Sequence, residues 1–130
     1  MTVHTREIAR EEWGQFFDKI SRHYLGRLVK VELLGADLGV RVVAQGLPLI
    51  GITAEHEAGG RVNILLVAGN LKEGHVTHAI SDPRHVWIEQ EINGSDNAIE
   101  ILSNSDYAVI IELSAPQPGA QAPGRVAMAF

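Results

Sequence analysis

Apolar residues between positions 10 and 25 recur with the period of an α-helix. They fall at i, i+3, i+4, i+7 and i+11, which predicts an apolar stripe about 100° wide on one helix face. The stripe consists of Trp13, Phe16, Phe17, Ile20 and Tyr24. Gly26 follows, and glycine suits the left-handed conformation that often ends a helix. We expect this helix to pack on a sheet and close the core; the alternative is an aromatic box that faces a ligand.

After the helix the period changes to that of β-strands. In residues 27–34, Val29, Val31 and Leu33 alternate with polar positions, which predicts a half-buried strand. Short apolar runs separated by turn residues continue to residue 113 and predict about six or seven strands. Residues 114–130 are rich in Pro, Gly and Ala and predict a tail. The expected organisation is therefore a single domain over residues 1–113 and a tail over 114–130.

Glycine and proline positions predict a strongly bent sheet. Gly46 is expected to end a strand over residues 40–45, and a separate strand is expected over 47–55. In that strand, Pro48 predicts an edge or a strand start, and Gly51 predicts a bulge or a sharp bend. Such bends turn the corners of small barrels. The predicted fold is α+β, with one N-terminal amphipathic helix packed on a strongly bent antiparallel sheet or a small, partly open β-barrel.

The last two runs predict a hairpin whose register can be specified. A turn over residues 104–106 would set Ile101 opposite Val109 and Ile99 opposite Ile111, which keeps one face apolar. The other face is mixed. Its acidic members are Glu89, Glu91, Glu100 and Glu112, and its apolar members are Trp87, Leu102, Ala108 and Ile110.

The mixed face is the best functional lead in the sequence. The helix, the tail or another subunit could cover it, and if none does, its apolar side chains predict an interaction surface. We expect Trp87, Leu102 and Ile110 to lie in this surface, with Trp87 as its anchor, because tryptophan is favoured at interaction hot spots.

Composition excludes several classes of protein. The chain has no cysteine, so it has no disulfides and no thiolate metal ligands. Its net charge is −5 and its 11 Lys and Arg residues are scattered, which disfavours binding to nucleic acids and to anionic membranes. The first residues run into a charged helix start without an apolar stretch, so no signal peptide is expected. We expect a cytoplasmic protein.

The histidines offer the main candidates for polar chemistry. His75 and His78 are three residues apart on a predicted strand, so they would point to opposite faces and could not share a metal ion. His56, His75 and His78 are the candidate polar contacts of a small-molecule pocket. The segment 81–85 contains Ser, Asp and His, but it predicts a turn before Pro83 rather than a catalytic triad. We expect no catalytic residues, no metal site and no cofactor.

Three stretches together resemble a known family. They are Arg6-Glu7-Ile8 with Glu12-Trp13 and Phe16-Phe17, then residues 46–52 (GLPLIGI), then residues 75–83 (HVTHAISDP). Over roughly residues 5–113 the chain resembles small bacterial proteins that are catalogued only as a domain of unknown function. The resemblance implies a bacterial, cytoplasmic, single-domain protein, and it brings no functional residues.

These observations favour a non-catalytic binding or assembly domain that forms a homo-oligomer. One alternative is a β-barrel that binds a small molecule. Another is an RNA-binding module of the Sm-like or SH3-like kind, a comparison at the level of the fold alone. An enzyme of an unrecognised type is the remaining alternative.

Overall fold

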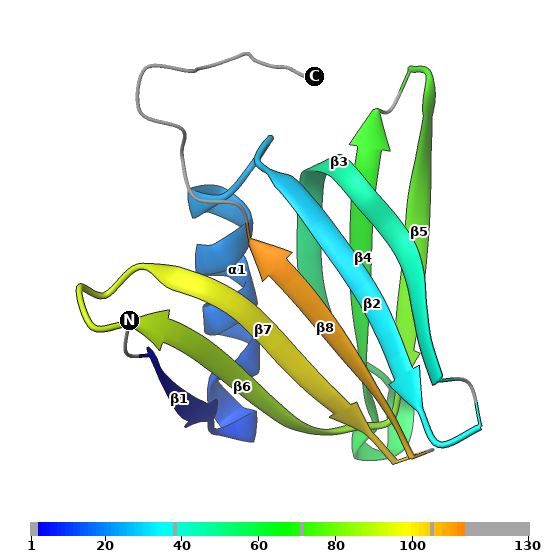
Figure 1. The fold of residues 1–130 in the computed structure, drawn as a ribbon. Coiled ribbons are helices and arrows are strands. Elements are labelled where there is room, and N and C mark those ends of the chain that lie inside the picture. Colours follow the sequence, from blue (N-terminus) through cyan, green and yellow to red (C-terminus); the bar gives the residue numbers. More distant parts are fainter. Residues whose placement is uncertain (1–2, 38, 71, 105, 114–130) are drawn as a thin grey trace.

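Over the residues that the structure describes, the chain forms one α-helix and eight antiparallel strands (Figure 1). The structure is a computed structural model that describes residues 3–37, 39–70, 72–104 and 106–113. In chain order, the elements are β1 (Val3–Ile8), the 3-10 turn η1 (Arg10–Glu12), α1 (Trp13–His23), β2 (Leu28–Gly35), β3 (Gly39–His56), the 3-10 turn η2 (Ala58–Gly60), β4 (Val62–Asn70), β5 (Gly74–Ser81), β6 (Pro83–Glu91), β7 (Asp96–Ser103) and β8 (Tyr107–Leu113). The α+β prediction is confirmed.

The strands form an open sheet in the order β1-β6-β7-β8-β2-β3-β4-β5. The outermost strands, β1 and β5, each pair on one side only among the described residues, so the sheet does not close into a barrel. The count of eight strands exceeds the predicted six or seven. β1 is a strand that the pattern did not predict, because its sequence VHTREI has only one buried residue, Ile8, and therefore carries little strand signal. Pairing with β6 holds it in place, with Ile8 opposite Val86.

Strand β3 is a single strand of 18 residues, where two strands were predicted. Gly46 does not end a strand. It is an extra residue in the ladder, because Val29 pairs with Leu47 and Lys30 pairs with Gln45. Its φ of 70° is the conformation that glycine adopts most readily in such a bulge. A bulged glycine therefore lets one strand bend and continue.

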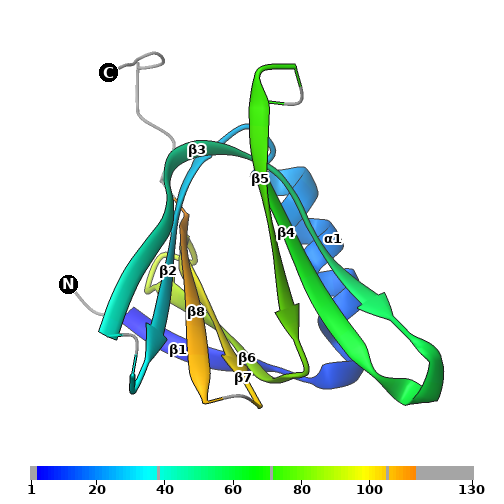
Figure 2. The same cartoon turned by 90° about the vertical axis from the view of Figure 1, so that its right-hand side faces the viewer.

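The second bend in β3 lies where the sequence predicts it. Leu49 pairs with Ala68 and Gly51 with Val67, so one residue between them is unpaired. At the same place the strand changes partner, because Pro48 is the last residue that pairs with β2 and Leu49 the first that pairs with β4. Figure 2 shows the result, with β3 arching from β2 across to β4.

Helix α1 covers the concave side of this sheet. In Figure 1 it lies behind β6, β7 and β8. Trp13, Phe17 and Ile20 are buried, as the apolar stripe predicts, and Gly26 takes the predicted positive φ of 83° after the helix. The helix begins at Trp13 rather than at residue 10, because residues 10–12 form a separate 3-10 turn.

A serine on the helix replaces the strand partner that β3 loses at its bend. Ser21 Oγ donates a hydrogen bond to the carbonyl of Ile52 (2.8 Å) and accepts one from the N–H of Ile52 (2.9 Å). Both backbone groups of Ile52 are therefore satisfied on the side that β2 no longer covers. The contact joins α1 to the point where the two halves of the sheet meet.

The core lies between the helix and the inner face of the sheet. Its fully buried members from the last strands include Ile99, Ile101, Val109 and Ile111. Ile99 pairs with Ile111 and Ile101 with Val109, so the predicted hairpin register is confirmed. Because neighbours alternate between faces, this register also fixes which residues of β6, β7 and β8 point away from the core.

Candidate functional site

The sheet surface that points away from the core, here called the outer face, is built mainly from three rows of side chains that cross the strands. The rows follow from the pairing registers of β1, β6, β7, β8, β2 and β3. The first row is Thr5, Glu89, Ala98, Glu112, Lys30 and Gln45. The second is Glu7, Trp87, Glu100, Ile110, Glu32 and Val42. The third is His85, Leu102, Ala108, Leu34 and Val40.

The second row alternates strictly between carboxylates and apolar side chains. Trp87 lies between Glu7 and Glu100, and Ile110 lies between Glu100 and Glu32. Neighbouring strands are about 4.8 Å apart, so successive carboxylates of the row lie about 10 Å apart along the backbone positions. The third row is apolar apart from His85. The outer face is therefore amphipathic, as its sequence parity predicts.

Trp87, Leu102 and Ile110, the predicted contact residues, all lie on the outer face and are partly exposed. Trp87 and Ile110 share the second row, and Leu102 lies in the third row between His85 and Ala108. Helix α1 packs on the opposite side of the sheet and does not cover them. The tail over residues 114–130 lies outside the described residues, so the alternative that the tail covers the outer face stays untested.

Two hollows open on the outer face and share Glu89, Ala98 and Ile110 in their walls. The smaller, of about 160 Å³, is here called the Trp87 hollow; Thr5, Trp87 and Glu100 complete its lining. The larger, of about 610 Å³, lies toward β2 and the end of β8 and is lined in addition by residues such as Lys30, Gln45, Glu112 and Leu113. The outer face is thus indented beside its tryptophan.

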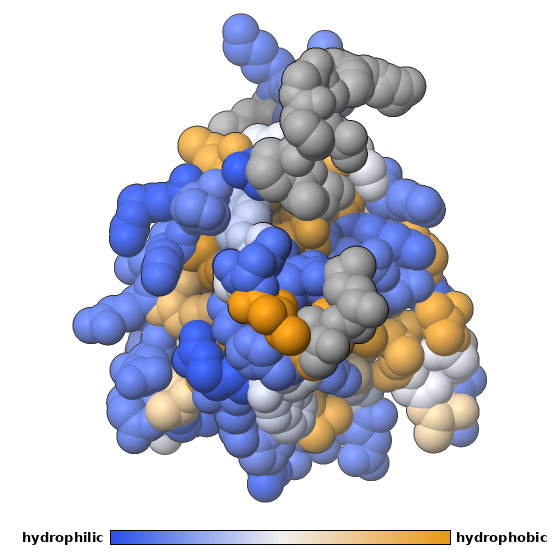
Figure 3. All heavy atoms as spheres, turned by 60° about the vertical axis from the view of Figure 1, so that its left-hand side comes forward, coloured by the Kyte–Doolittle hydropathy of each residue, from blue (hydrophilic) through white to orange (hydrophobic). Residues whose placement is uncertain are grey.

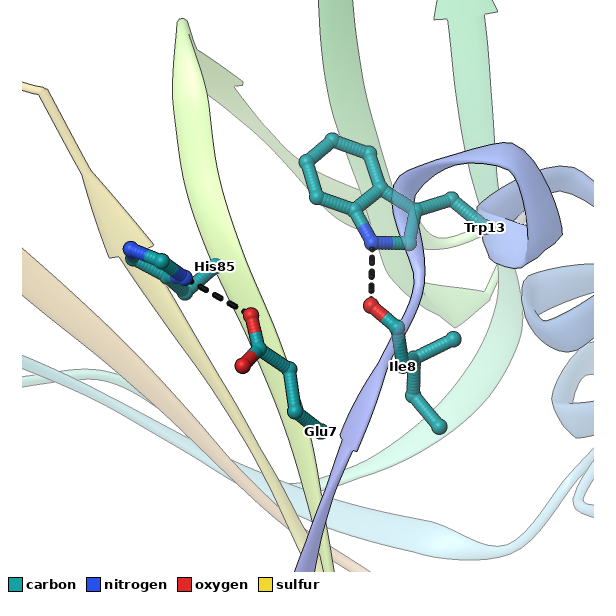
Figure 4. A network of polar contacts seen from close by, with 4 residues as sticks. All are labelled: Glu7, Ile8, Trp13 and His85. Atoms are coloured by element: carbon teal, nitrogen blue, oxygen red, sulfur yellow. Dashed lines mark hydrogen bonds and ion pairs between the residues drawn. The ribbon is translucent and has the colours of Figure 1, made fainter.

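Next to Trp87, a histidine stacks on its ring and a glutamate contacts that histidine. The His85 ring stacks on Trp87, with 5.2 Å between ring centroids and 20° between ring planes. His85 Nδ1 lies 2.7 Å from a carboxylate oxygen of Glu7 on β1. Figure 4 shows this pair on one side of β1 and Ile8 with Trp13 on the other, where the Trp13 indole donates a hydrogen bond to the Ile8 carbonyl (3.0 Å).

Hydrophilic side chains dominate the side of the molecule on which β1, β6 and β7 lie. In Figure 3, apolar groups in this view are separate islands among hydrophilic residues rather than one continuous patch. A surface of this kind buries apolar area only together with charged groups.

Glu7, Glu32 and Lys30 belong to the outer face, but the sequence does not group them with Trp87. Their membership depends on β1 pairing with β6 and on β2 pairing with β8, which are contacts between segments far apart in the chain. The alternation in residues 27–34 placed Lys30 and Glu32 on the polar side of their own strand. No local signal tells which strand lies beside it.

A second indentation, here called the Tyr24 cleft, has about 250 Å³ and lies between α1, β1 and the turn after β6. Tyr24 OH donates a hydrogen bond to Asp96 Oδ2 (2.8 Å), and Gln90 Nε2 donates one to Asp96 Oδ1 (2.8 Å). Burial and the bond to Asp96 raise the pKa of Tyr24 to about 12. Arg6, Lys19, His23, Phe16, Ile20 and Gly94 complete the lining. No pattern in the sequence predicts this cleft.

The three histidines proposed for a small-molecule pocket do not converge. His56 pairs with Val62 and His75 pairs with Gly69, so the two lie near opposite ends of β4, about 23 Å apart along the strand. His78 lies between them, opposite Leu66. Its Nε2 atom is buried and has no hydrogen-bond partner among the described residues, and burial lowers its pKa below the usual 6.5.

Over the part of the chain that the structure describes, no three His, Asp or Glu side chains come together in a way that could hold a metal ion. Among these same residues, no helix has both the length and the apolar character needed to cross a membrane.

Comparison with known proteins places the chain in a family. It is 23% identical over 114 residues to an uncharacterised protein of the bacterium Aquifex aeolicus (strain VF5), an alignment that covers 88% of this chain and 96% of that protein. No solved structure matches. Residues 4–122 match a family of unknown function, DUF5335, so the match extends beyond the last described residue. The protein therefore belongs to the DUF5335 family of unknown function, in agreement with the resemblance in its sequence.

Proposed function

We propose that this protein is a non-catalytic binding or assembly domain and that the outer face is its contact surface. One observation supports the proposal most: Trp87 is partly exposed beside a hollow of about 160 Å³, on a face that α1 does not cover. Tryptophan is the residue type most enriched at binding hot spots, where it fills pockets and excludes water. A partner on this face would bury Trp87, Leu102 and Ile110 together.

The assembly form of the proposal is a homo-oligomer with these residues in its interface. Light scattering coupled to size-exclusion chromatography, over a wide concentration range, measures the oligomeric state of the wild type and of Trp87→Ala. We expect the wild type to associate and Trp87→Ala to shift it to the monomer. Val76→Ala is the control, since Val76 is 37% exposed on β5, away from the outer face.

Two results would contradict this form of the proposal. A wild type that stays monomeric at every concentration excludes self-assembly. An oligomer that Val76→Ala weakens and Trp87→Ala leaves intact would place the interface elsewhere. Circular dichroism on each variant shows whether a loss of association reflects unfolding instead.

A small anionic ligand in the Tyr24 cleft is a second candidate function. Arg6, Lys19 and His23 line the cleft and form no ion pair among the described residues, although the chain as a whole carries a net charge of −5. Asp96 in the cleft already accepts two hydrogen bonds. In a thermal-shift assay with phosphate and citrate, we expect stabilisation that Lys19→Gln reduces and that Lys72→Gln, outside the cleft, does not. Equal shifts in both variants would contradict a ligand at this site.

The RNA-binding alternative has less support. RNA binding draws most of its affinity from cations that neutralise phosphates. The outer face instead presents six glutamates, and the net charge is negative.

A further inference from the structure

We infer that the outer face binds a cationic segment of a partner protein, one in which Lys or Arg side chains alternate with apolar side chains. This inference rests on the proposed contact surface, and it specifies the partner as a cationic segment in place of the second copy of the chain that the homo-oligomer would require. The arrangement of charge on the outer face carries it.

The outer face has far more negative than positive groups. Its carboxylates are Glu7, Glu32, Glu89, Glu91, Glu100 and Glu112, and its basic groups are Lys30 and His85. Lys30 lies 3.6 Å from Glu32, and His85 lies 2.7 Å from Glu7. Both basic groups therefore already have an acidic neighbour.

Of the remaining carboxylates, Glu91 accepts a hydrogen bond from Asn97 (2.7 Å). Glu112 lies opposite Lys30, whose ammonium group is placed 3.6 Å from Glu32 instead. Glu89, Glu100 and Glu112 form no ion pair and no hydrogen bond with another described residue. Glu89 and Glu100 line the Trp87 hollow, and Glu89 and Glu112 line the larger one. The negative charge that a partner would meet is thus concentrated around the two hollows.

Apolar side chains stand between these carboxylates. Glu100 on β7 lies between two apolar side chains of the second row, Trp87 on β6 and Ile110 on β8. Lysine and arginine have long apolar stems, which can lie over such side chains while the charged head reaches a neighbouring carboxylate. An arginine can also stack on the exposed part of an indole. The alternation of the second row therefore matches a partner that alternates cationic and apolar groups.

Charge also disfavours the other occupants. Two copies that meet through the outer face would bring two sets of glutamates together, and like charges across an interface cost free energy. A nucleic acid would meet the same repulsion. The tail of this chain, residues 114–130, contains one basic residue, Arg125, against six glutamates on the outer face. A partner with several cations fits the face better than any of these.

A synthetic peptide in which Lys and Leu alternate tests the inference. Isothermal titration calorimetry at low and at moderate salt measures its Kd for the full-length chain. The key comparison is between two variants with the same net charge, Glu100→Gln with Glu112→Gln on the outer face, and Glu55→Gln with Glu73→Gln, both exposed away from it. Only the first pair should raise the Kd, by about three- to tenfold.

Two further measurements sharpen the test. Trp87→Ala should raise the Kd by more than about tenfold, and Trp87→Phe should restore part of the affinity. Added salt should weaken binding, because exposed charges are screened. A peptide with Glu in place of Lys should not bind.

Several results would overturn the inference. If the two double variants raise the Kd of the peptide equally, the peptide binds through general attraction to a negatively charged protein and not through the outer face. If the Glu peptide binds as tightly as the Lys peptide, the partner is not cationic. Tighter binding of an oligouridylate than of the Lys peptide would contradict the cationic partner as well. If Trp87→Ala abolishes self-association while both double variants bind the peptide alike, the assembly domain stands and the cationic partner does not. If Trp87→Ala changes neither property, both proposals fail.

Discussion

Tyr24 and His78 show how burial sets protonation at the scale of single residues. Tyr24 is buried next to Asp96, and both the burial and the hydrogen bond favour its neutral form. His78 is partly buried on β5, and burial alone favours its neutral form. In each case the folded protein and the unfolded chain have different affinities for a proton, so each residue makes the stability depend on pH. Tyr24 does so in alkaline solution and His78 in acid.

Replacement of Tyr24 by Phe should lower the free energy of unfolding by about 1–2 kcal/mol at neutral pH, because the hydrogen bond to the Asp96 carboxylate is lost. The stability of the wild type should also depend on pH in alkaline solution. Tyrosine in the unfolded chain ionises near pH 10, whereas Tyr24 in the folded protein keeps its proton to about pH 12. The folded state therefore binds more protons in this window, and stability falls as pH rises through it.

Urea unfolding of both proteins between pH 8 and about 12 measures this difference. The stability difference between wild type and Tyr24→Phe should shrink as pH rises above 10. A constant difference across the range would contradict the raised pKa.

Replacement of His78 by Leu should stabilise the protein, most of all in acid. The Nε2 atom of His78 is buried without a partner, and a buried polar atom without a hydrogen bond costs about 1–3 kcal/mol. Because its pKa is lowered in the folded state, the unfolded chain binds a proton first as pH falls below 6.5, and stability drops. The wild type should therefore lose more stability than His78→Leu between pH 7 and 5, as measured by urea unfolding. Parallel pH profiles would show that His78 does not contribute.

At the scale of elements, the turn between β4 and β5 depends on close backbone contact. Gly69 has a φ of 125°, and a Cβ added there would lie 2.7 Å from the Cα of His75 and 2.8 Å from the carbonyl oxygen of Gly74. Both contacts are with backbone atoms, which cannot move aside without opening the hairpin. The edge strand β5 pairs only with β4 among the described residues, so its position depends on this turn.

Gly69→Ala should therefore destabilise the protein by at least about 1–3 kcal/mol, the range for a strained backbone conformation. Gly14→Ala is the matched control. Gly14 lies inside α1 with nothing within 4 Å of an added Cβ, so alanine there should raise stability by about 0.5–1 kcal/mol. Thermal unfolding of both variants measures whether the melting temperature falls in Gly69→Ala and rises in Gly14→Ala. A stabilising Gly69→Ala would mean that the hairpin accommodates the side chain.

At the scale of the whole molecule, one strand holds the two parts of the sheet together. β3 pairs with β2 through its first half and with β4 through its second, and Ser21 on α1 bonds to it at the bend. The core residues of both parts belong to one cluster, which includes Ile99 from β7 and Ile64 from β4. The domain should therefore unfold as one cooperative unit.

Ile99→Ala and Ile64→Ala test this unity, since both side chains are fully buried and lie in different parts of the sheet. Each should cost about 2–5 kcal/mol. Under native conditions, hydrogen exchange of slow amides in β4 and in β7 should accelerate together in either variant. Acceleration confined to the mutated part would indicate two independently unfolding units.

Local patterns in the sequence were enough to predict several elements. The helical stripe predicted the buried Trp13, Phe17 and Ile20, and strand alternation predicted the register of Ile99 with Ile111. The same alternation placed Trp87 and Glu100 on the outward side. These features depend on residues close together in the chain, whose period of 3.6 or 2 fixes the face on which a side chain lies.

The order of strands was decided only by tertiary structure. β1 has one buried residue and becomes a strand by pairing with β6, and β3 continues through Gly46 because β2 pairs with the residues on both sides of it. The rows of the outer face and the lining of the Tyr24 cleft depend on the same long-range contacts. Periodicity reports the apolar side of a segment but not which segment lies beside it. That choice is made by the packing of the whole core, which is a property of all the strands at once.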